Sequence, residues 1–101
     1  MDKIEKLFEC EGFDWDKGNI EKNWLKHKVS PVECEQIFFN EPLIILDDPE
    51  HSIAEERFAA FGCTDAGRFL VIVFTKRARL IRIISARDMD RRERKFYEEE
   101  Q

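Results

Sequence analysis

Arginines crowd one part of this sequence in a way that suits the binding of an anion. Residues 76–95 hold nine lysines and arginines against three carboxylates, a local net charge of +6 in a chain whose formal net charge is -5. A guanidinium group is planar, and it matches the oxygen atoms of a phosphate in paired hydrogen bonds. The run therefore indicates an anionic partner, and the alternative is a solvated face whose arginines pair with nearby carboxylates.

The arginines that we expect to converge come from neighbouring strands and one turn. They are Arg57, Arg77, Arg82 and Arg87. Side-chain alternation along the expected strand 80–87 puts Arg82 and Arg87 on opposite faces, each beside apolar residues. An arginine on a packed face needs a partner, so each of the two either binds a ligand or forms an internal salt bridge. The expected internal partners are Glu55, Glu56 and Glu93.

Three further side chains could move a proton. His27 ordinarily titrates near neutral pH, while Glu93 and Tyr97 lie four residues apart and share a helical face. Each also has a structural interpretation: a helix-end histidine held by a backbone carbonyl, a capping glutamate and a core aromatic residue. His51 lies in an acidic loop, and we expect it to be simply exposed.

The totals limit the class of protein. A chain of 101 residues with 43% hydrophobic residues supports a single small domain, residues 1–101, with residues 1–12 as an N-terminal extension. No apolar stretch is long enough to span a membrane, and the start has no secretory pattern, so we expect a cytoplasmic protein. Cys10, Cys34 and Cys63 are too far apart for a zinc site and read as small hydrophobic residues, so we expect no metal or other cofactor.

A first helix is expected over about residues 17–28. Asp16 is a suitable N-cap for it. Ile20, Trp24 and Leu25 repeat at helical spacing, which predicts that these three side chains face the core.

Two more helices carry start signals. Ser30 and Glu33 form a capping box before the second helix, and Asp90 and Glu93 form another before the last one. A weaker amphipathic turn is expected over residues 3–9. The expected core-facing residues are Cys34, Ile37 and Phe38 in the second helix and Met89, Phe96 and Tyr97 in the last.

Between the second and last helices the hydrophobic pattern is that of strands, at residues 43–46, 56–63, 68–75 and 80–87. The third run is apolar at nearly every position, which is typical of a central strand buried on both faces. The expected fold is α+β: two N-terminal helices, a four-stranded antiparallel sheet and a C-terminal helix.

Five segments in this order and spacing resemble the BrnT family of type II toxin–antitoxin toxins. They are FDWDKGNIEKNWLKHKVS, IFFNEPLIIL, EERFAAFG, GRFLVIVFTKR and IRIISARDMDRRERKFYEE, which together span about residues 13–99. The resemblance implies a RelE-like fold and a metal-independent endoribonuclease that inhibits translation. It also implies neutralisation by a BrnA-type antitoxin with a ribbon-helix-helix domain, through which alone the complex would contact operator DNA.

A ribonuclease of this kind would use its residues in defined roles. The ribose 2′-OH attacks the adjacent phosphate, which requires a base, cations for the developing charge and an acid for the leaving oxygen. The implied catalytic residues are His27, Arg82, Arg87, Glu93 and Tyr97. The implied phosphate-binding residues are Arg57, Arg77 and Arg91. Trp15 and Trp24 either stack on bases or belong to the core.

The chain departs from the family pattern at four positions. Lys28 and Ala78 replace glycines that are common there, Pro31 replaces an aromatic residue, and Phe74 stands where tyrosine is common. If that tyrosine hydroxyl takes part in catalysis, this chain lacks it. The alternative function is therefore a non-catalytic module that binds the antitoxin and acts as a co-repressor.

Overall fold

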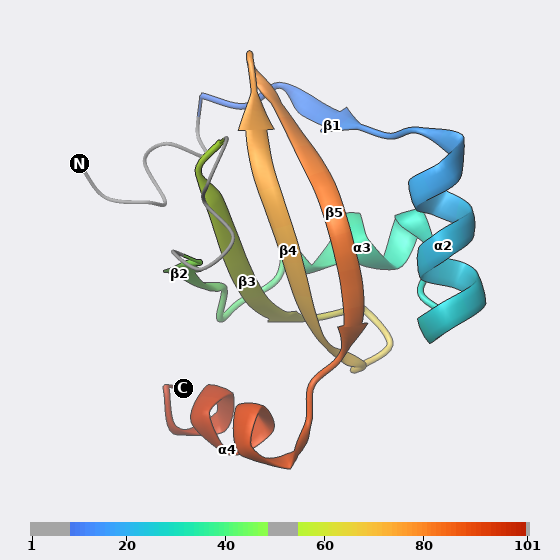
Figure 1. Ribbon diagram of the computed structural model, residues 1–101. Coiled ribbons are helices and arrows are strands. Elements are labelled where there is room, and N and C mark those ends of the chain that lie inside the picture. Colours follow the sequence, from blue (N-terminus) through green and yellow to red (C-terminus); the bar gives the residue numbers. More distant parts are fainter. Residues whose placement is uncertain (1–8, 49–54, 101) are drawn as a thin grey trace.

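The computed structural model describes residues 9–48 and 55–100, in which three helices and five strands form one α+β unit (Figure 1). The expected turn at 3–9 and the residue His51 fall outside the described ranges, except for Glu9. The helices are α2 (Lys17–His27), α3 (Pro31–Ile37) and α4 (Arg91–Glu99). The strands are β1 (Gly12–Asp14), β2 (Ile44–Asp47), β3 (Arg57–Cys63), β4 (Phe69–Arg77) and β5 (Leu80–Asp88).

The sheet has five strands and is mixed, so the prediction of four antiparallel strands is wrong in one respect. The strand order is β1-β5-β4-β3-β2, with antiparallel pairing between β2, β3, β4 and β5. The short β1 pairs in parallel with the start of β5. Three residues with only one apolar side chain carry too little periodicity to indicate a strand, which is why the sequence did not reveal β1.

The expected helix starts are confirmed. The Asp16 side chain accepts a hydrogen bond from the Asn19 backbone N–H at 2.7 Å, which caps α2. Complete capping boxes begin α3, at Ser30 and Glu33, and α4, at Asp90 and Glu93.

One face of the sheet, here called the α3 face, packs against α3 and holds the larger core. Phe74 at its centre is 1% exposed, with its ring 5.4 Å from that of Phe58 and 5.3 Å from that of Phe38. A side chain at Gly62 would place its Cβ only 2.9 Å from the Cβ of Ile37, so this glycine permits α3 to approach β3 closely.

The opposite face, here called the α4 face, is covered by α4 over only part of its area. Tyr97 packs there against Phe61 and Val71 in a second, smaller core. Beyond these residues the strands present their outward side chains on a face that no helix covers in the described structure (Figure 1).

A β-bulge in β5 overturns the prediction of which faces of the sheet its arginines occupy. Val73 pairs with Ser85 and Phe74 with Ile83, so Ile84 is an extra residue in the register. The buried Ile83 and Ala86 consequently share the α3 face. Arg82 and Arg87 therefore both lie on the α4 face, whereas strict alternation predicted opposite faces.

The inward face of α2 also differs from the prediction. Trp24 and Leu25 are 48% and 71% exposed, and Asn23 is buried instead. The Asn19 side-chain amide donates to the Ile83 carbonyl at 2.9 Å, and the Asn23 side-chain oxygen accepts from the Ala86 N–H at 3.2 Å. These two amides satisfy backbone groups of β5 beyond the end of β1, so polar residues occupy positions where the hydrophobic pattern predicted apolar ones.

The cysteines behave as expected, since Cys34 is buried and Cys10 and Cys63 are half-buried, all as free thiols. Burial raises the pKa of the Cys34 thiol to about 12. Within the described ranges, no helix has the length and apolar character that crossing a membrane requires.

Candidate functional site

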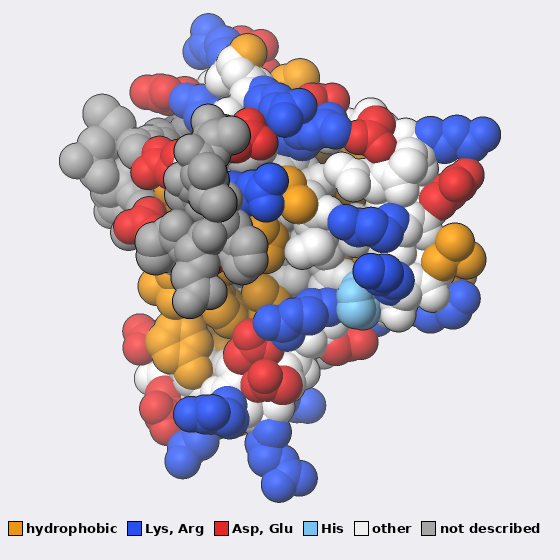
Figure 2. Space-filling view, in the orientation of Figure 1, with side chains coloured by type: hydrophobic (Ala, Val, Ile, Leu, Met, Phe, Trp, Pro, Cys, Tyr) orange, Lys and Arg blue, Asp and Glu red, His pale blue; other side chains and the backbone are white. Residues whose placement is uncertain are grey.

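Strand register places three of the predicted arginines together on the α4 face. Thr75 at the end of β4 pairs with Arg57 of β3 on one side and with Arg82 of β5 on the other. Arg77 lies two residues beyond Thr75 and therefore on the same face. Arg57, Arg77 and Arg82 are called the arginine surface below, and Figure 2 shows Lys and Arg side chains interspersed with carboxylates on this side of the molecule.

Arg82 is held by two carboxylates from the segment that includes β1. Its Nη1 lies 3.3 Å from Oδ2 of Asp14, and its Nη2 forms a short hydrogen bond with Oδ2 of Asp16. The Asn19 N–H and the Arg82 guanidinium together hold the pKa of Asp16 below its ordinary value. Asp16 was predicted only as a helix cap, and its second carboxylate oxygen fixes the site arginine.

Arg77 pairs with Glu55, which the sequence had suggested as a partner for Arg82 or Arg87. The Arg77 Nε and Nη2 lie 3.3 and 3.2 Å from the carboxylate oxygens of Glu55. The hydrogen bond from Arg77 lowers the pKa of Glu55, and the charges of Arg57 and Arg82 lower it further. The arginine surface thus combines three guanidinium groups with the carboxylates of Asp14, Asp16 and Glu55.

Arg87 and Glu93 form the internal salt bridge that the sequence offered as an alternative to catalysis. The two guanidinium nitrogens of Arg87 lie 2.7 and 2.8 Å from the two carboxylate oxygens of Glu93. This contact lowers the pKa of Glu93, which also accepts the Asp90 N–H of its capping box. Arg87 is five residues from Arg82 along β5, or roughly 15 Å, so the two do not contact one phosphate.

Tyr97 lies apart from both groups. Its side chain is fully buried, and its hydroxyl donates a 2.5 Å hydrogen bond to the Pro42 carbonyl. Burial raises the pKa of the phenol. Its geometry is that of a core aromatic residue, the alternative interpretation of this position.

Arg91 begins α4 and is exposed, and it lines a shallow surface cavity with Arg94 and Lys95. It belongs to neither the arginine surface nor the Arg87–Glu93 pair.

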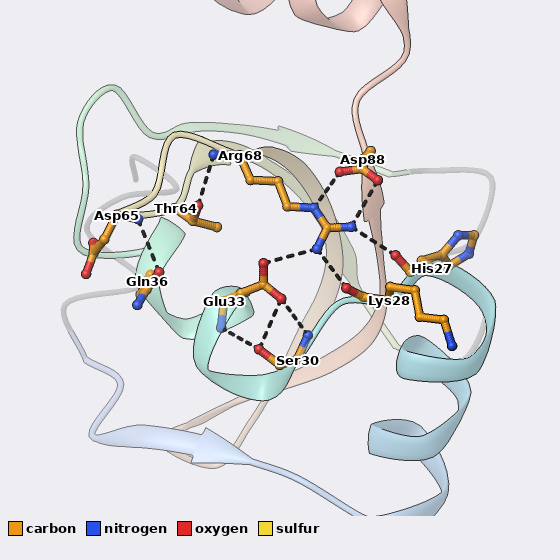
Figure 3. Close-up of polar contacts among 9 residues, drawn as sticks. All are labelled: His27, Lys28, Ser30, Glu33, Gln36, Thr64, Asp65, Arg68 and Asp88. Carbon is orange, nitrogen blue, oxygen red and sulfur yellow. Dashed lines mark hydrogen bonds and ion pairs between the residues drawn. The ribbon is translucent and has the colours of Figure 1, made fainter.

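Arg68, which the sequence analysis did not single out, joins the ends of three elements (Figure 3). Its guanidinium donates to Asp88 at the end of β5 at 2.6 and 3.0 Å, and to Glu33 of α3 at 3.0 Å. It also donates to the carbonyl oxygens of His27 and Lys28, at 2.9 and 2.7 Å. Arg68 thereby fixes the end of α2 against β5.

His27 is the last residue of α2, and its side chain is exposed. Its backbone carbonyl is bound by Arg68, while its imidazole has no hydrogen bond within the described residues. The hydrogen bond from Arg68 holds the pKa of Asp88 below its ordinary value, and the His27 charge adds to this effect. The imidazole is accessible, and it lies near the Asp88 end of β5 rather than near Arg82.

The family model described as "Ribonuclease toxin, BrnT, of type II toxin-antitoxin system" matches residues 15–93. The chain belongs to the BrnT family. No curated protein matches the chain.

The match contains every element of the arginine surface and the Arg87–Glu93 pair, and it ends before Tyr97. Type II membership implies an antitoxin partner.

Two departures from the BrnT pattern keep the backbone shape that glycine favours. Lys28 and Ala78 both have φ of 54°, in the left-handed region. Lys28 ends α2 in this conformation and donates its N–H to the Trp24 carbonyl at 2.9 Å.

The third departure, Phe74, lies on the α3 face inside the larger core. A hydroxyl at this position would point away from the arginine surface, so its absence removes nothing from that surface.

Asp14, Asp16, Glu55 and Arg68 are the site residues that sequence reasoning did not assign to their observed partners. Each is a single charged residue in a chain with 39% charged residues. Their partners lie 20 to 68 residues away in sequence, so no local spacing could reveal these pairs.

Proposed function

We propose that this chain is a metal-independent endoribonuclease toxin that cleaves RNA on its arginine surface and thereby inhibits translation. The observation that carries the proposal is the register of Arg57, Thr75 and Arg82 across three strands, with Arg77 on the same face. Three guanidinium groups on one open face can bind a phosphate and stabilise the charge that develops as the 2′-OH attacks it.

Arg82 is the central residue of this proposal. It pairs with Thr75 across the sheet. Within the described residues, two of its five N–H donors have protein acceptors. The remaining donors can contact phosphate oxygens while Asp14 and Asp16 hold the guanidinium in place. The 2′-OH still needs a base, and the carboxylates of Asp14 and Glu55 are candidates because they are bonded to the arginines that would hold the phosphate.

His27 and Arg87 are proposed to contact the RNA at the other end of β5. Roughly 15 Å separates Arg82 from Arg87, so an RNA strand crossing the α4 face would reach both regions with different nucleotides. If His27 instead transfers the proton, replacing it with Ala removes one limb of the pH–rate profile. Our proposal predicts that this limb is unchanged.

We further propose a BrnA-type ribbon-helix-helix antitoxin as the partner, with operator DNA bound only through that antitoxin. The support for this partner is family membership and the resemblance described above. The antitoxin would cover or distort the α4 face and so deny RNA access to it.

The alternative function, a non-catalytic antitoxin-binding module, has one observation in its favour. Arg77, Arg82 and Arg87 all have carboxylate partners in the folded chain, as residues of a purely structural network would. The alternative predicts that the chain is harmless when produced without its antitoxin.

Induction of the chain alone in bacteria separates the two functions. The measurements are growth rate and the integrity of cellular RNA, beside an Arg82→Ala/Arg87→Ala variant whose fold is checked by circular dichroism. We expect growth arrest with RNA loss from the wild type and neither effect from the variant. A folded, abundant and harmless wild type would establish the binding module instead.

A further inference from the structure

The lysines of α2 differ from the site arginines because none of them has a carboxylate partner. Residues 17–28 contain Lys17, Lys22, Lys26 and Lys28 against Glu21, a net charge of +3. Within the described residues none of these lysines forms an ion pair, and all four are exposed. Within the described residues, α2 therefore carries lysine charge that no carboxylate of the protein compensates.

The position of two of these lysines relative to the arginine surface is fixed. Asn19 and Asn23 attach α2 to β5 through backbone hydrogen bonds. Lys22 and Lys26 follow these asparagines by three residues each, so they lie beside the buried line of the helix. Figure 2 shows Lys and Arg side chains along the boundary between the sheet and α2, on the same side as the arginine surface.

The outer side of α2 also exposes apolar surface. Leu25 is 71% exposed, and Trp24 is 48% exposed with the Lys28 ammonium 5.3 Å from its ring centre. Trp24 lies two residues from both Lys22 and Lys26, so its ring is on the other side of the helix and serves as a control position for the surface that these lysines form.

We propose that the side of α2 that carries Lys22 and Lys26 is a second RNA-binding surface, on which these two lysines hold phosphates of the strand that leaves the arginine surface. RNA is favoured over an acidic protein segment because Lys22 and Lys26 flank the part of β5 that carries Arg82, so a polyanion bound on the arginine surface continues onto them. This inference rests on the proposed function for the identity of its ligand.

Binding is best measured with a fluorescent RNA oligonucleotide carrying 2′-O-methyl groups, which lack the attacking hydroxyl and so cannot be cleaved. The test variant is Lys22→Gln/Lys26→Gln. The control variant is Arg92→Gln/Lys95→Gln, which removes two positive charges from exposed positions of α4. Fluorescence anisotropy at several salt concentrations gives the affinity and its salt dependence, and circular dichroism checks both folds.

We expect the α2 variant to bind about tenfold more weakly at low salt and to reduce the slope of log affinity against log salt by about 1.4, at ~0.7 per lost phosphate contact. Trp24→Ala, on the other side of α2, should leave both the affinity and the slope unchanged. The control should change each quantity much less. Equal affinities of the α2 variant and the wild type would overturn the proposal and leave an acidic protein segment as the ligand of this face.

Cleavage of unmodified RNA by the same proteins separates this inference from the proposed function. Under saturating RNA we expect the α2 variant to retain the wild-type kcat and to show only a raised KM. Wild-type protein that binds the modified RNA but never cleaves RNA would contradict the ribonuclease proposal and leave the α2 surface standing. Cleavage by the α2 variant with an unchanged KM would contradict the α2 surface and leave the ribonuclease proposal standing.

Discussion

Arg82 and Arg68 look alike in burial and charge partners, yet their hydrogen bonds give them different uses. Their side chains are 20% and 26% exposed, and each pairs with two carboxylates. All five N–H donors of Arg68 have acceptors within the protein, three on carboxylates and two on backbone carbonyls. Among the residues that the structure describes, Arg82 uses two of its five. It can therefore donate to a further anion, whereas Arg68 cannot without losing a structural hydrogen bond.

In our proposal, unused N–H donors rather than charge separate an arginine that binds RNA from one that only holds the fold. Arg77 resembles Arg82, with two donors used. Arg87 is intermediate, with three hydrogen bonds to Glu93 and the Asp88 carbonyl.

The largest expected effect is loss of catalysis in Arg82→Ala. Removing one contact to the developing phosphorane charge costs about 3 kcal/mol, or ~100-fold in kcat/KM. Kinetics with a short RNA substrate measure it. Arg92→Ala, an exposed arginine of α4, is the control and should change the rate less than threefold. A folded Arg82→Ala protein with wild-type activity would show that the spare donors of Arg82 are not used.

A loss of stability with little loss of activity is expected in Arg68→Met. This change keeps side-chain bulk but leaves Asp88 and Glu33 without their cation. We expect the free energy of unfolding to fall by about 2–3 kcal/mol, since charge-assisted hydrogen bonds in a half-exposed network are lost. Urea denaturation measures the change. At temperatures where the variant is folded, its cleavage rate should stay within a few-fold of the wild type. A rate loss as large as that of Arg82→Ala would break the distinction between the two arginines.

A fall in pH should weaken the network of charged hydrogen bonds around Arg68. The Arg68 guanidinium lowers the pKa of Asp88, and hydrogen bonds from Ser30 and Arg68 lower that of Glu33 against the opposing effect of burial. Their contribution to stability is complete above the ordinary values of 3.8 and 4.5 and is lost as pH falls through the lowered ones. Between pH 6 and pH 3 the wild type should lose more unfolding free energy than Arg68→Met. Parallel pH profiles of the two proteins would contradict this assignment.

Tyr97 is a neutral group whose single side-chain donor, the hydroxyl, is already bonded to the Pro42 carbonyl. Tyr97→Phe leaves the Pro42 carbonyl without that partner and should cost about 1 kcal/mol of unfolding free energy. Cleavage should be unchanged. A tenfold loss of activity in the folded variant would restore Tyr97 as a candidate acid.

The smallest expected effect is a gain. Asp16→Asn keeps a good N-cap for α2 but removes a negative charge from Arg82. RNA should bind about two- to fivefold more tightly, as a surface ion pair worth under ~1 kcal/mol no longer competes. Anisotropy with the 2′-O-methyl RNA measures this. Weaker binding would mean that Asp16 orients Arg82 more than it competes with the ligand.

Much of this architecture was predictable from the sequence because it depends on local signals. The capping residues Asp16, Ser30 and Asp90 start their helices as predicted. The four longer strands, β2 to β5, occur where apolar runs indicated them. The exposure of Trp24 was not predictable, because two asparagine amides replace apolar side chains against β5.

For the candidate site, the sequence indicated which arginines to consider but not how they are arranged or which carboxylates hold them. The arginines were recognised by type, and the pairing of Arg87 with Glu93 was one of the two alternatives. A one-residue bulge at Ile84 decides on which face Arg87 lies, and nothing in the local pattern of β5 announces it. Arg68 differs from Arg82 only in the acceptors around it, which come from distant segments.

The most direct test of the account is the chemistry of the RNA ends produced by the purified wild-type chain in excess EDTA. Attack by the 2′-OH leaves a 2′,3′-cyclic phosphate on one fragment and a 5′-hydroxyl on the other, and mass spectrometry distinguishes these from 3′-hydroxyl and 5′-phosphate ends. We predict cyclic-phosphate ends from the wild type and about 100-fold less product from Arg82→Ala. Intact RNA, or cleavage that stops in EDTA, would contradict it.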